Sequence, residues 1–354
     1  MDGLLFREMR ECDDDLLLFQ ELFASSPHPK SIEHLRWQYL QNPWGKLLVG
    51  LVEDQRARRL AASYAVVPVP VRLGDRRVLA GIAIDGMTSS EYRHRGLFVK
   101  LVKRTHARCE REGLAFVYGF PNENSSHGIF RSLGWTPPAP PMLMVRPFRL
   151  TSLVRRLLHL PRVPRAQSGM PARPMPSDFK PVEEPGVVSL PTFDDETDRL
   201  WTDFSRGFAV TVDRSHDYMN WRFVRKPEAK YFIRALKSGR DYEALIVYTM
   251  RDGPDMRIGN VMDLFFRAGG EAAGRVLLKI ACQHLHRAGC GAATVVSFTH
   301  APGYHLYARS GFLAIPPVKP YKMRWGFTPL ELDAKPLLAN AANWYLSYSD
   351  FDWV

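Results

Sequence analysis

The sequence predicts an α/β fold of two tandem domains, each with a mixed, mostly antiparallel sheet flanked by helices. A length of 354 residues exceeds one ordinary domain and is close to two domains with connectors. The composition, 45% hydrophobic and 24% charged, is typical of globular proteins and argues against a largely disordered or fibrous chain. A repeat within the sequence then indicates that the two domains are related.

The repeat joins segments that lie about half the chain apart. Residues 31–43 (SIEHLRWQYLQNP) and 215–227 (SHDYMNWRFVRKP) share a serine, an acid, an apolar residue, a tryptophan, an aromatic residue and a proline at an offset of 184. A second pair, 130–135 (FRSLGW) and 307–312 (YARSGF), follows in the same order at an offset of 177. Two ordered matches at nearly equal offsets predict a tandem of related domains.

Proline and charge locate the boundary between the domains. Thirteen of the 27 prolines fall between residues 137 and 191, a density that sustains neither a helix nor a central strand. Residues 146–180 hold seven Arg and one Lys against one acid. We therefore predict a domain over 1–150, a basic connector over 151–194 that opens with a short amphipathic helix at 151–160, a second domain over 195–330 and a C-terminal tail over 331–354.

Periodicity predicts the elements of the first domain in order. A helical opening is followed by β-branched runs at 61–72 and 77–84, which predict strands. An amphipathic pattern at 97–112 predicts a helix, and the apolar run at 114–119 predicts the next strand. A strand-helix-strand unit therefore lies at the centre of a mixed sheet.

The second domain repeats the pattern, with a helix predicted at 272–288 and a strand at 292–298. Each domain then has a short helix before a glycine and an aromatic residue. We expect these glycines, Gly134 and Gly311, to end the helices, because glycine readily adopts the left-handed conformation found there.

Charge and cysteine usage limit the function classes. A net charge of +11 indicates an anionic ligand or surface without separating phosphate, nucleic acid and lipid. No apolar run approaches the roughly 20 residues of a membrane span and the N-terminus is acidic, so we expect a soluble, cytoplasmic protein. The scattered cysteines predict four free thiols and no metal site: Cys12, Cys109, Cys282 and Cys290.

The most informative segment is 82–102 (IAIDGMTSSEYRHRGLFVKLV), in which an apolar strand leads through a polar loop into an amphipathic helix. A helix N-terminus offers unpaired backbone N–H groups, and a glycine there lets a ligand come close to the backbone. The pattern favours a diphosphate site, with a solvated basic turn as the alternative. The loop presents Arg93, His94, Arg95 and Gly96.

This segment resembles the acetyl-CoA signature R/Q-x-x-G-x-G/A of the GCN5-related N-acetyltransferase (GNAT) superfamily. The match is 93–98 (RHRGLF), preceded by 90–92 (SEY) where the family often has Pro-Glu-Tyr. Phe98 departs from the small residue of the signature, although bulky residues occur there in the enhanced-intracellular-survival acetyltransferases. A later family motif, an Asn and then a helix ending Tyr-x-x-x-Gly-Phe, is similar to Asn122, Asn124 and 130–135.

The resemblance covers the first domain well and the second weakly, and it implies two tandem GNAT-like domains with acetyl-CoA as cosubstrate. Gly86, Met87 and Thr88 would pair with the pantetheine arm and direct an N–H group at the thioester oxygen. Asn122 or Asn124 would bond the pantetheine or orient the substrate. The diphosphate would lie on Arg93, His94, Arg95, Gly96, Leu97, Phe98 and Val99.

The N-acetyltransferase reaction that the resemblance implies needs a base, because an alkyl amine with a pKa of about 10.4 is almost fully protonated at pH 7. The candidates are Asp85 on the strand and His127 at the start of the last helix, with Glu91 third. The alternative roles are a strand-end acid for Asp85 and a helix cap for His127. The tyrosine that protonates the leaving thiolate in many relatives is replaced by Phe130.

The second domain keeps a tyrosine, Tyr307, at the position of Phe130, but its segment 264–274 (LFFRAGGEAAG) lacks the acetyl-CoA signature. We therefore expect it to have lost cofactor binding and to shape the acceptor site. In the survival-type relatives the chain terminus reaches the active site, which makes Val354 a candidate for the same position.

The expected function is transfer of an acyl group to a primary amine of a small molecule or amino sugar. Two alternatives of other classes remain. The first is a FemABX-like transferase that uses aminoacyl-tRNA, in which the basic connector would contact RNA phosphate. The second is a noncatalytic acyl-CoA-binding protein. The loop at 93–98 argues against the first alternative, so nucleic acid is not the expected partner.

Overall fold

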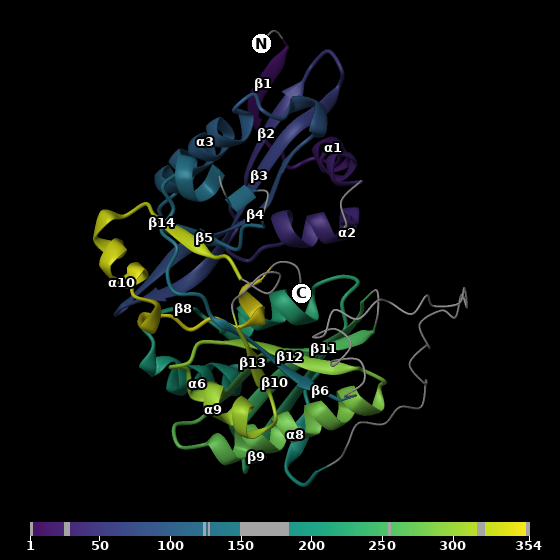
Figure 1. Cartoon of the computed structure of the whole chain (residues 1–354), viewed down its shortest axis with the longest axis vertical. Helices are drawn as coiled ribbons and strands as arrows, with labels where there is room; N and C mark the ends of the chain where they lie inside the picture. Colours follow the sequence, from purple (N-terminus) through teal and green to yellow (C-terminus); the bar gives the residue numbers. More distant parts are fainter. Residues whose placement is uncertain are drawn as a thin grey trace, which may run out of the picture.

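Two seven-stranded mixed sheets flanked by helices make up the computed structural model of the chain, and Figure 1 shows one above the other. This confirms the predicted α/β fold of two tandem domains. Among the described helices, none is long and apolar enough to cross a membrane. The predicted helix at 151–160 lies outside the described residues, which are 3–24, 29–122, 125–126, 128–148, 184–253, 256–316 and 323–351.

The first sheet has the strand order β1-β2-β3-β4-β5-β14, with β8 beside β3. Its neighbouring strands are antiparallel except β4 and β5, which are parallel. The strands are β1 (Leu4–Glu8), β2 (Leu48–Asp54), β3 (Arg59–Leu73), β4 (Arg76–Thr88), β5 (Leu114–Gly119), β8 (Val210–Val212) and β14 (Gly326–Pro329). The helices are α1 (Asp13–Phe23), α2 (Ile32–Leu35) and α3 (Leu97–Arg111), with short turns η1 (Arg36–Leu40), η2 (Ser90–Tyr92) and η3 (Gly128–Ser132).

The second sheet has the order β13-β6-β12-β11-β10-β9-β7, and only β11 and β12 are parallel. Its strands are β6 (Met142–Pro147), β7 (Val187–Ser189), β9 (Tyr231–Ser238), β10 (Asp241–Asp252), β11 (Arg257–Phe266), β12 (Ala292–Ser297) and β13 (Leu313–Ile315). The helices are α6 (Asp195–Phe204), α7 (His216–Met219), α8 (Glu271–Arg287) and α9 (Pro302–Arg309), whereas α10 (Lys335–Ala339) contacts β14 of the first sheet. Short turns are η4 (Ser205–Gly207), η5 (Asn220–Val224), η6 (Leu332–Ala334), η7 (Ala341–Asn343) and η8 (Tyr348–Asp350).

The elements with strong local patterns lie where the sequence predicts them. The strand predicted at 114–119 is β5, and the helices predicted at 97–112 and 272–288 are α3 and α8 with ends shifted by one residue. Gly134 and Gly311 have φ angles of 67° and 85°, the left-handed conformation expected where these helices end. All four cysteines are free thiols, as predicted.

The two sheets exchange strands, so they do not coincide with the predicted ranges 1–150 and 195–330. β6 precedes the connector in sequence but pairs with β12 and β13 of the second sheet. In return, β14 follows the second sheet and pairs with β5 of the first. A strand at the edge of a sheet exposes unpaired backbone groups, and this reciprocal pairing covers one such edge beside each parallel strand pair.

The repeated segments predicted from sequence meet at the interface between the domains. Trp37 and Trp221 occupy equivalent positions of the repeat, and their rings stack with centroids 5.0 Å apart. Each indole donates to the backbone carbonyl of the other tryptophan, at 2.8 Å from Trp37 and 3.2 Å from Trp221. The buried aromatic surface and the two hydrogen bonds therefore join the domains about an approximate twofold relation.

A hydrogen-bonded tyrosine–histidine pair, which the sequence analysis did not find, occurs in both domains and connects a helix to each sheet. The hydroxyl of Tyr64 on β3 lies 2.9 Å from Nε2 of His106 on α3. In the second domain the hydroxyl of Tyr248 on β10 lies 2.6 Å from Nδ1 of His284 on α8. Burial lowers the pKa of both histidines to about 4, because the charged imidazolium loses its hydration inside the protein.

These histidines predict a loss of stability in mild acid. Between pH 6.5 and about 4 these histidines take up protons in the unfolded chain but stay neutral in the folded chain. Their contribution to the free energy of unfolding is therefore complete above pH 6.5 and is lost as the pH falls. We expect each histidine to contribute about 2 kcal/mol to the loss at pH 4.5. His106→Gln should therefore flatten the dependence of the melting temperature on pH. The exposed His305 provides the control, and equal slopes for His106→Gln and His305→Gln would contradict the assignment.

Candidate functional site

The parallel strands β4 and β5 of the first sheet part at their carboxyl ends. Their pairing runs from Leu79 and Leu114 to Ala83 and Gly119, whereas β4 continues to Thr88. A Cβ on Gly119 would lie 2.9 Å from the carbonyl oxygen of Ala83, so the close approach at the last pair requires glycine. Beyond Ala83, no strand among the described residues pairs with β4 on this side.

A bulge interrupts β4 within this unpaired stretch. Asp85 and Gly86 on β4 lie opposite the single residue Tyr64 on β3. Asp85 has a φ angle of 49°, and the hydroxyl of Ser63 donates to its carbonyl oxygen at 2.9 Å. Because a bulge redirects the strand, it changes the direction of the backbone groups that follow. The predicted residues Gly86, Met87 and Thr88 form the end of β4 after the bulge.

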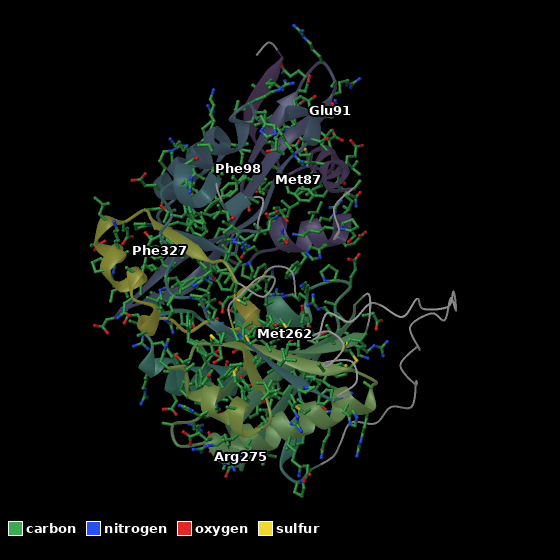
Figure 2. All side chains as sticks on the ribbon, viewed as in Figure 1. Met87, Glu91, Phe98, Met262, Arg275 and Phe327 are labelled. Atoms are coloured by element: carbon green, nitrogen blue, oxygen red, sulfur yellow. The ribbon has the colours of Figure 1, made fainter. Side chains whose placement is uncertain are left out.

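Phe98 packs directly against the bulge. A Cβ on Gly86 would lie 3.0 Å from Cε2 of Phe98, and the Phe98 ring meets the ring of Tyr64 edge-on at 6.0 Å. Figure 2 marks Phe98 and Met87 in the upper domain. The bulky residue that departs from the acetyl-CoA signature therefore fills the space between α3 and Gly86.

The loop before α3 presents exposed basic residues at a helix start that has no acidic residue. Gly96 is the N-cap of α3 and has a φ angle of 70°, and a Cβ at this position would have no atom within 4 Å. The first turn of α3 contains no acidic residue, and its N–H groups have no intrahelical acceptors. Arg93, His94 and Arg95 are exposed, and the Arg95 guanidinium lies 5.4 Å from the centroid of the Tyr92 ring.

The carboxylate of Asp85 is held by the repeated segment of the first domain. Lys30 Nζ lies 2.7 Å from its Oδ2, the Tyr39 hydroxyl donates at 2.5 Å and Gln38 Nε2 donates at 3.0 Å. Lys30 also donates to Gln38 Oε1 at 3.0 Å. These contacts connect α2 and η1 to the bulge, so Asp85 fixes the position of the segment that carries Trp37.

The pKa of Asp85 lies below its usual value. Burial raises this pKa, but the charge of Lys30 and the hydrogen bonds from Lys30, Tyr39 and Gln38 outweigh burial. A carboxylate with a low pKa and an ion-pair partner is a weak general base. The contacts of Asp85 favour a positioning role over the predicted catalytic one, which stays a prediction.

The other predicted site residues lie beyond β5 or in the loop. Asn122 is exposed, and its Oδ1 accepts the backbone N–H of Ser125 at 3.0 Å. Glu91, the third candidate base, is exposed and pairs with Arg59. His127 and Asn124 lie outside the described residues, as does Val354 at the chain end.

Phe130, which replaces the expected tyrosine acid, packs against β14. A Cβ on Gly326 would lie 2.6 Å from Cε1 of Phe130. The tyrosine at the equivalent position of the second domain, Tyr307, is buried beside Phe312, with ring centroids 5.7 Å apart. In these contacts the side chains of Phe130 and Tyr307 therefore pack against neighbouring residues.

A small cavity lies on the face of the first sheet opposite α3. Its volume is about 40 Å³, and its walls come from β3, β4, both repeated segments and the C-terminal residues. Ile82 and Ile84 on β4 bring it next to the bulge, and Phe351 stacks on Phe120 with ring centroids 3.8 Å apart. The lining residues are Trp37, Gln38, Val67, Ile82, Ile84, Tyr218, Trp221, Arg222, Ser349 and Phe351.

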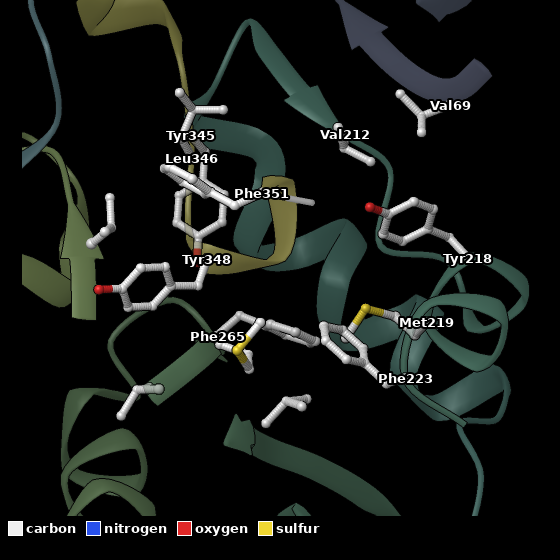
Figure 3. Packing of buried hydrophobic residues seen from close by; sticks show 14 of the residues in the cluster. Val69, Val212, Tyr218, Met219, Phe223, Phe265, Tyr345, Leu346, Tyr348 and Phe351 are labelled. Carbon is white, nitrogen blue, oxygen red and sulfur yellow. The ribbon is translucent and has the colours of Figure 1, made fainter. Parts of the chain in front are cut away.

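The second domain has a similar parting of parallel strands, but the C-terminal segment fills it. Residues Ile258–Asn260 of β11 pair with Ala292–Thr294 of β12, and β11 continues beyond this pairing to Phe266. The hydroxyl of Ser349 donates to the carbonyl oxygen of Met262 on β11, at 3.2 Å, and the Tyr348 hydroxyl donates to Thr294 Oγ1 on β12, also at 3.2 Å. Figure 3 shows Tyr345, Tyr348 and Phe351 among the core side chains of this domain.

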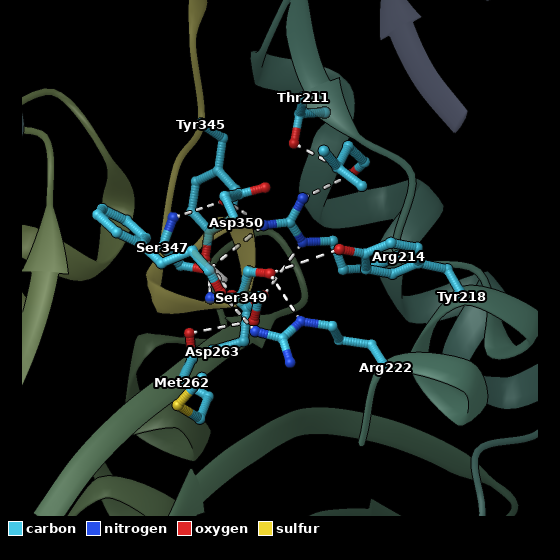
Figure 4. A network of polar contacts seen from close by, with 12 residues as sticks. Thr211, Arg214, Tyr218, Arg222, Met262, Asp263, Tyr345, Ser347, Ser349 and Asp350 are labelled. Carbon is cyan, nitrogen blue, oxygen red and sulfur yellow. Dashed lines mark hydrogen bonds and ion pairs between the residues drawn. The ribbon is translucent and has the colours of Figure 1, made fainter. Parts of the chain in front are cut away.

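Buried arginines hold the C-terminal segment in place (Figure 4). Arg214 lies 3.1 Å from Asp263 on β11 and 2.7 Å from Asp350, and all three side chains are fully buried. Arg222 donates to the carbonyl oxygens of Ser349 and Phe351 at 3.2 and 2.6 Å. Removing one member of such a buried charge network leaves the others uncompensated, so the segment is a fixed part of the second domain.

The sequence of the first domain identifies the family of that domain. Residues 8–137 match the sequence profile described as an acetyltransferase (GNAT) domain. The first domain is a GNAT domain. The parted β4 and β5, the bulge and the loop before α3 all lie within the matched residues, so the predicted resemblance to the GNAT superfamily is confirmed. A comparison with curated proteins gave no sequence match.

Solved structures share the tandem fold over most of the chain. N-myristoyltransferase from Saccharomyces cerevisiae with bound myristoyl-CoA is similar with a TM-score of 0.63 and 12% identity, over 92% of this chain and 82% of that one. A GCN5-related N-acetyltransferase from Anabaena variabilis is similar with a TM-score of 0.62 and 12% identity, over 95% of this chain and 75% of that one. At such identities the likeness shows the fold alone.

The sequence analysis missed the partners of Asp85 and the residues that seat the C-terminal segment. Lys30 and Asp85 are 55 residues apart, and Arg214 and Asp350 are 136 residues apart. A lone lysine or arginine carries no local pattern that marks such a partner. Two signals pointed to this region: the repeat, which includes Trp37 and Trp221, and the resemblance that made the chain end a candidate for the active site.

The Asp85 contacts predict a structural effect that is separable from chemistry. Asp85→Asn leaves the nearly buried Lys30 without its counter-charge, which should cost about 2 kcal/mol of unfolding free energy in denaturant titrations. Tyr39→Phe, which removes one hydrogen bond and keeps the ion pair, should cost about 1 kcal/mol. Asp85→Asn with unchanged stability would contradict the anchoring role.

Proposed function

We propose that the chain is an acyl-CoA-dependent N-acyltransferase that transfers the acyl group of a CoA thioester to a primary amine. The observation that carries this proposal is the combination found in the first domain: an unpaired β4 edge beside a bulge, next to a basic loop whose glycine caps α3. This combination fits the extended pantetheine arm and the diphosphate of CoA. Gly96 leaves room for a phosphate, and α3 begins without an opposing acid.

The residues on the α3 side would bind the donor. N–H groups of Leu97, Phe98 and Val99 at the start of α3 would bind the diphosphate, with Arg93 and Arg95 adding charge. The backbone of 86–88 would bond the pantetheine arm as an added strand and stabilise negative charge on the thioester oxygen. Bound acyl-CoA supplies the activated acyl group.

The acceptor would approach from the opposite face, with its amine directed towards the cavity at the domain interface, which at about 40 Å³ has room for a small group only. Its walls contain two tryptophans and several aliphatic residues, with Arg222 and Gln38 as polar groups. In the proposed reaction a C–N bond forms to the amine, the C–S bond breaks, CoA leaves as its thiolate and the proton of the amine passes to the base. Asp85 would position the cavity wall, and His127 remains the proposed base.

The second domain would shape the acceptor site and bind no CoA. Its β11–β12 parting is filled by residues 345–351, and the arginine of the loop before α8 is already engaged: Arg267 pairs with Asp241 and Glu243 at 3.6 and 3.8 Å. Glu271 adds a negative charge to the first turn of α8. This arrangement supports the expected division of labour between the two domains.

Acyl length and acceptor class need a direct assay. Release of free thiol from acetyl-CoA and myristoyl-CoA should be measured with small amines, amino sugars and peptides. Amine-dependent release with either thioester supports the proposal, and the better acceptor class defines the substrate. Binding of acyl-CoA without release would favour a noncatalytic acyl-CoA-binding protein. A salt-sensitive shift of tRNA would favour the FemABX-like alternative.

The loop assignment predicts a large effect of Gly96→Glu on cofactor affinity. The substitution places a carboxylate where the diphosphate would bind, so the affinity for acetyl-CoA in calorimetry should fall at least about thirtyfold, or about 2 kcal/mol. Gly269→Glu is a matched control in the second domain, because Gly269 also has a positive φ angle (75°) and open space at its Cβ position. Equal affinities in the two variants would contradict the assignment.

The filled second domain predicts a stoichiometry of one. Titration of the full chain with acetyl-CoA should give one site per chain, because residues 345–351 occupy the second parting and are held by buried ion pairs. Two equivalent sites, or one site that survives Gly96→Glu with full affinity, would contradict the proposed division between the domains.

A further inference from the structure

A separate cavity lies under the flank of α3 that faces β1. Its volume is about 230 Å³, and its walls come from β1, β2 and α3. A Cβ on Gly50 would lie 2.5 Å from Thr105 Oγ1, so glycine lets α3 lie close to β2 at the cavity floor. The charged side chains of the lining are Arg7, Glu8, Arg104, Arg108 and Arg111.

This cavity is on the other side of α3 from the proposed cofactor site. Phe98 and His106 mark the side of α3 that faces the bulge and Trp135, since the His106 and Trp135 rings stack at 5.9 Å. Lys100 and Arg104 instead lie over the ring of Phe6 on β1, at 4.7 and 5.8 Å. A ligand in this cavity would therefore contact residues that the proposed reaction does not use.

The cavity carries an excess of positive charge. Arg7 is compensated by the buried Asp15 at 2.6 Å and by Glu53 at 2.5 Å. Arg104 and Arg111 are exposed and form no ion pair with any residue the structure describes. Glu8 is the one carboxylate among the lining residues, against four arginines, although Glu112 next to the cavity also interacts with Arg108 and Arg111.

Arg108 has a buried guanidinium nitrogen that is ion-paired with Glu8 but makes no hydrogen bond with the described residues. Its Nη1 lies 2.9 Å from Glu8 Oε2 as an ion pair, but the direction of the N–H group satisfies no hydrogen bond with the described residues. An oxygen-bearing anion in the cavity would give this nitrogen a hydrogen-bond acceptor.

We propose that this cavity binds a small phosphate-bearing molecule. Guanidinium groups match phosphate oxygens with pairs of parallel N–H donors, and four of them line this one cavity. The volume of about 230 Å³ is several times the roughly 30 Å³ share of one water, so the cavity has room for a phosphate ester with a short carbon skeleton. The assignment does not depend on the proposed transferase activity.

Glycerol 3-phosphate, with glycerol as the uncharged control, is a suitable probe. Calorimetry on the full chain saturated with acetyl-CoA keeps the probe away from the loop before α3. We expect saturable binding of glycerol 3-phosphate and none of glycerol. Loss of probe binding on saturation with acetyl-CoA would overturn the proposal, because the phosphate would then bind at the loop.

Paired variants test the lining in opposite directions. Arg104→Gln with Arg111→Gln should lower the affinity at least about tenfold, whereas Glu8→Gln should raise it about threefold by removing the competing carboxylate. Lys103→Gln, on the exposed face of α3 outside the lining, should leave it unchanged. If the double variant does not fold, Glu8→Gln alone decides. An equal loss of probe affinity with Lys103→Gln would overturn the proposal. So would tighter binding of a short RNA that is weakened alike by Arg104→Gln, Arg111→Gln and Lys103→Gln, because that result would indicate a diffuse polyanion surface.

Discussion

The parting of two parallel strands is the constraint on which both domains depend. Where β4 leaves β5 and β11 leaves β12, backbone N–H and C=O groups lose their neighbours in the sheet. Buried backbone groups must find other partners, because leaving them unpaired costs about as much as a lost hydrogen bond. The first domain keeps this edge open beside a basic helix start. The second domain closes it with residues 345–351 of its own chain.

The C-terminal segment is what makes the two domains differ at this point. The closing segment brings its own charges, and Arg214 binds Asp263 and Asp350 in a site without solvent exposure. Burial raises the pKa of Asp350, and the charge of Arg214 opposes that rise. The same segment continues to Phe351, which stacks on Phe120 just after β5 of the first domain. The contacts that close the second domain therefore also build a wall beside the first domain's open edge.

The domain interface is built from the repeat itself. Trp37 and Trp221 exchange hydrogen bonds across it, and the exchanged strands β6 and β14 bind each sheet to residues from the other half of the chain. A single buried cluster consequently runs from Val69 of the first sheet to Phe265 of the second. Shape changes at this interface would alter the small cavity next to the bulge, since both tryptophans line it.

Local patterns in the sequence were sufficient for the parts of the site that one short segment builds. The segment 82–102 predicts a strand, a loop and a helix in the order observed, because alternation, a glycine N-cap and helical periodicity act over a few residues. It also singled out the position of Phe98, although not its contact with Gly86. The repeat predicted two related domains, because matching residues recur at a constant offset.

The sequence by itself therefore determined the tandem α/β architecture, the elements around the loop at 93–98 and the relation between the two halves. Tertiary structure alone decided that β6 and β14 change sheets, that Asp85 is held by Lys30, and that the C-terminal segment fills the second domain. The physical reason is the separation along the chain over which each interaction acts. A cap or an amphipathic period acts between neighbours in the chain, whereas an ion pair or a strand pairing between distant residues depends on how the whole chain has folded.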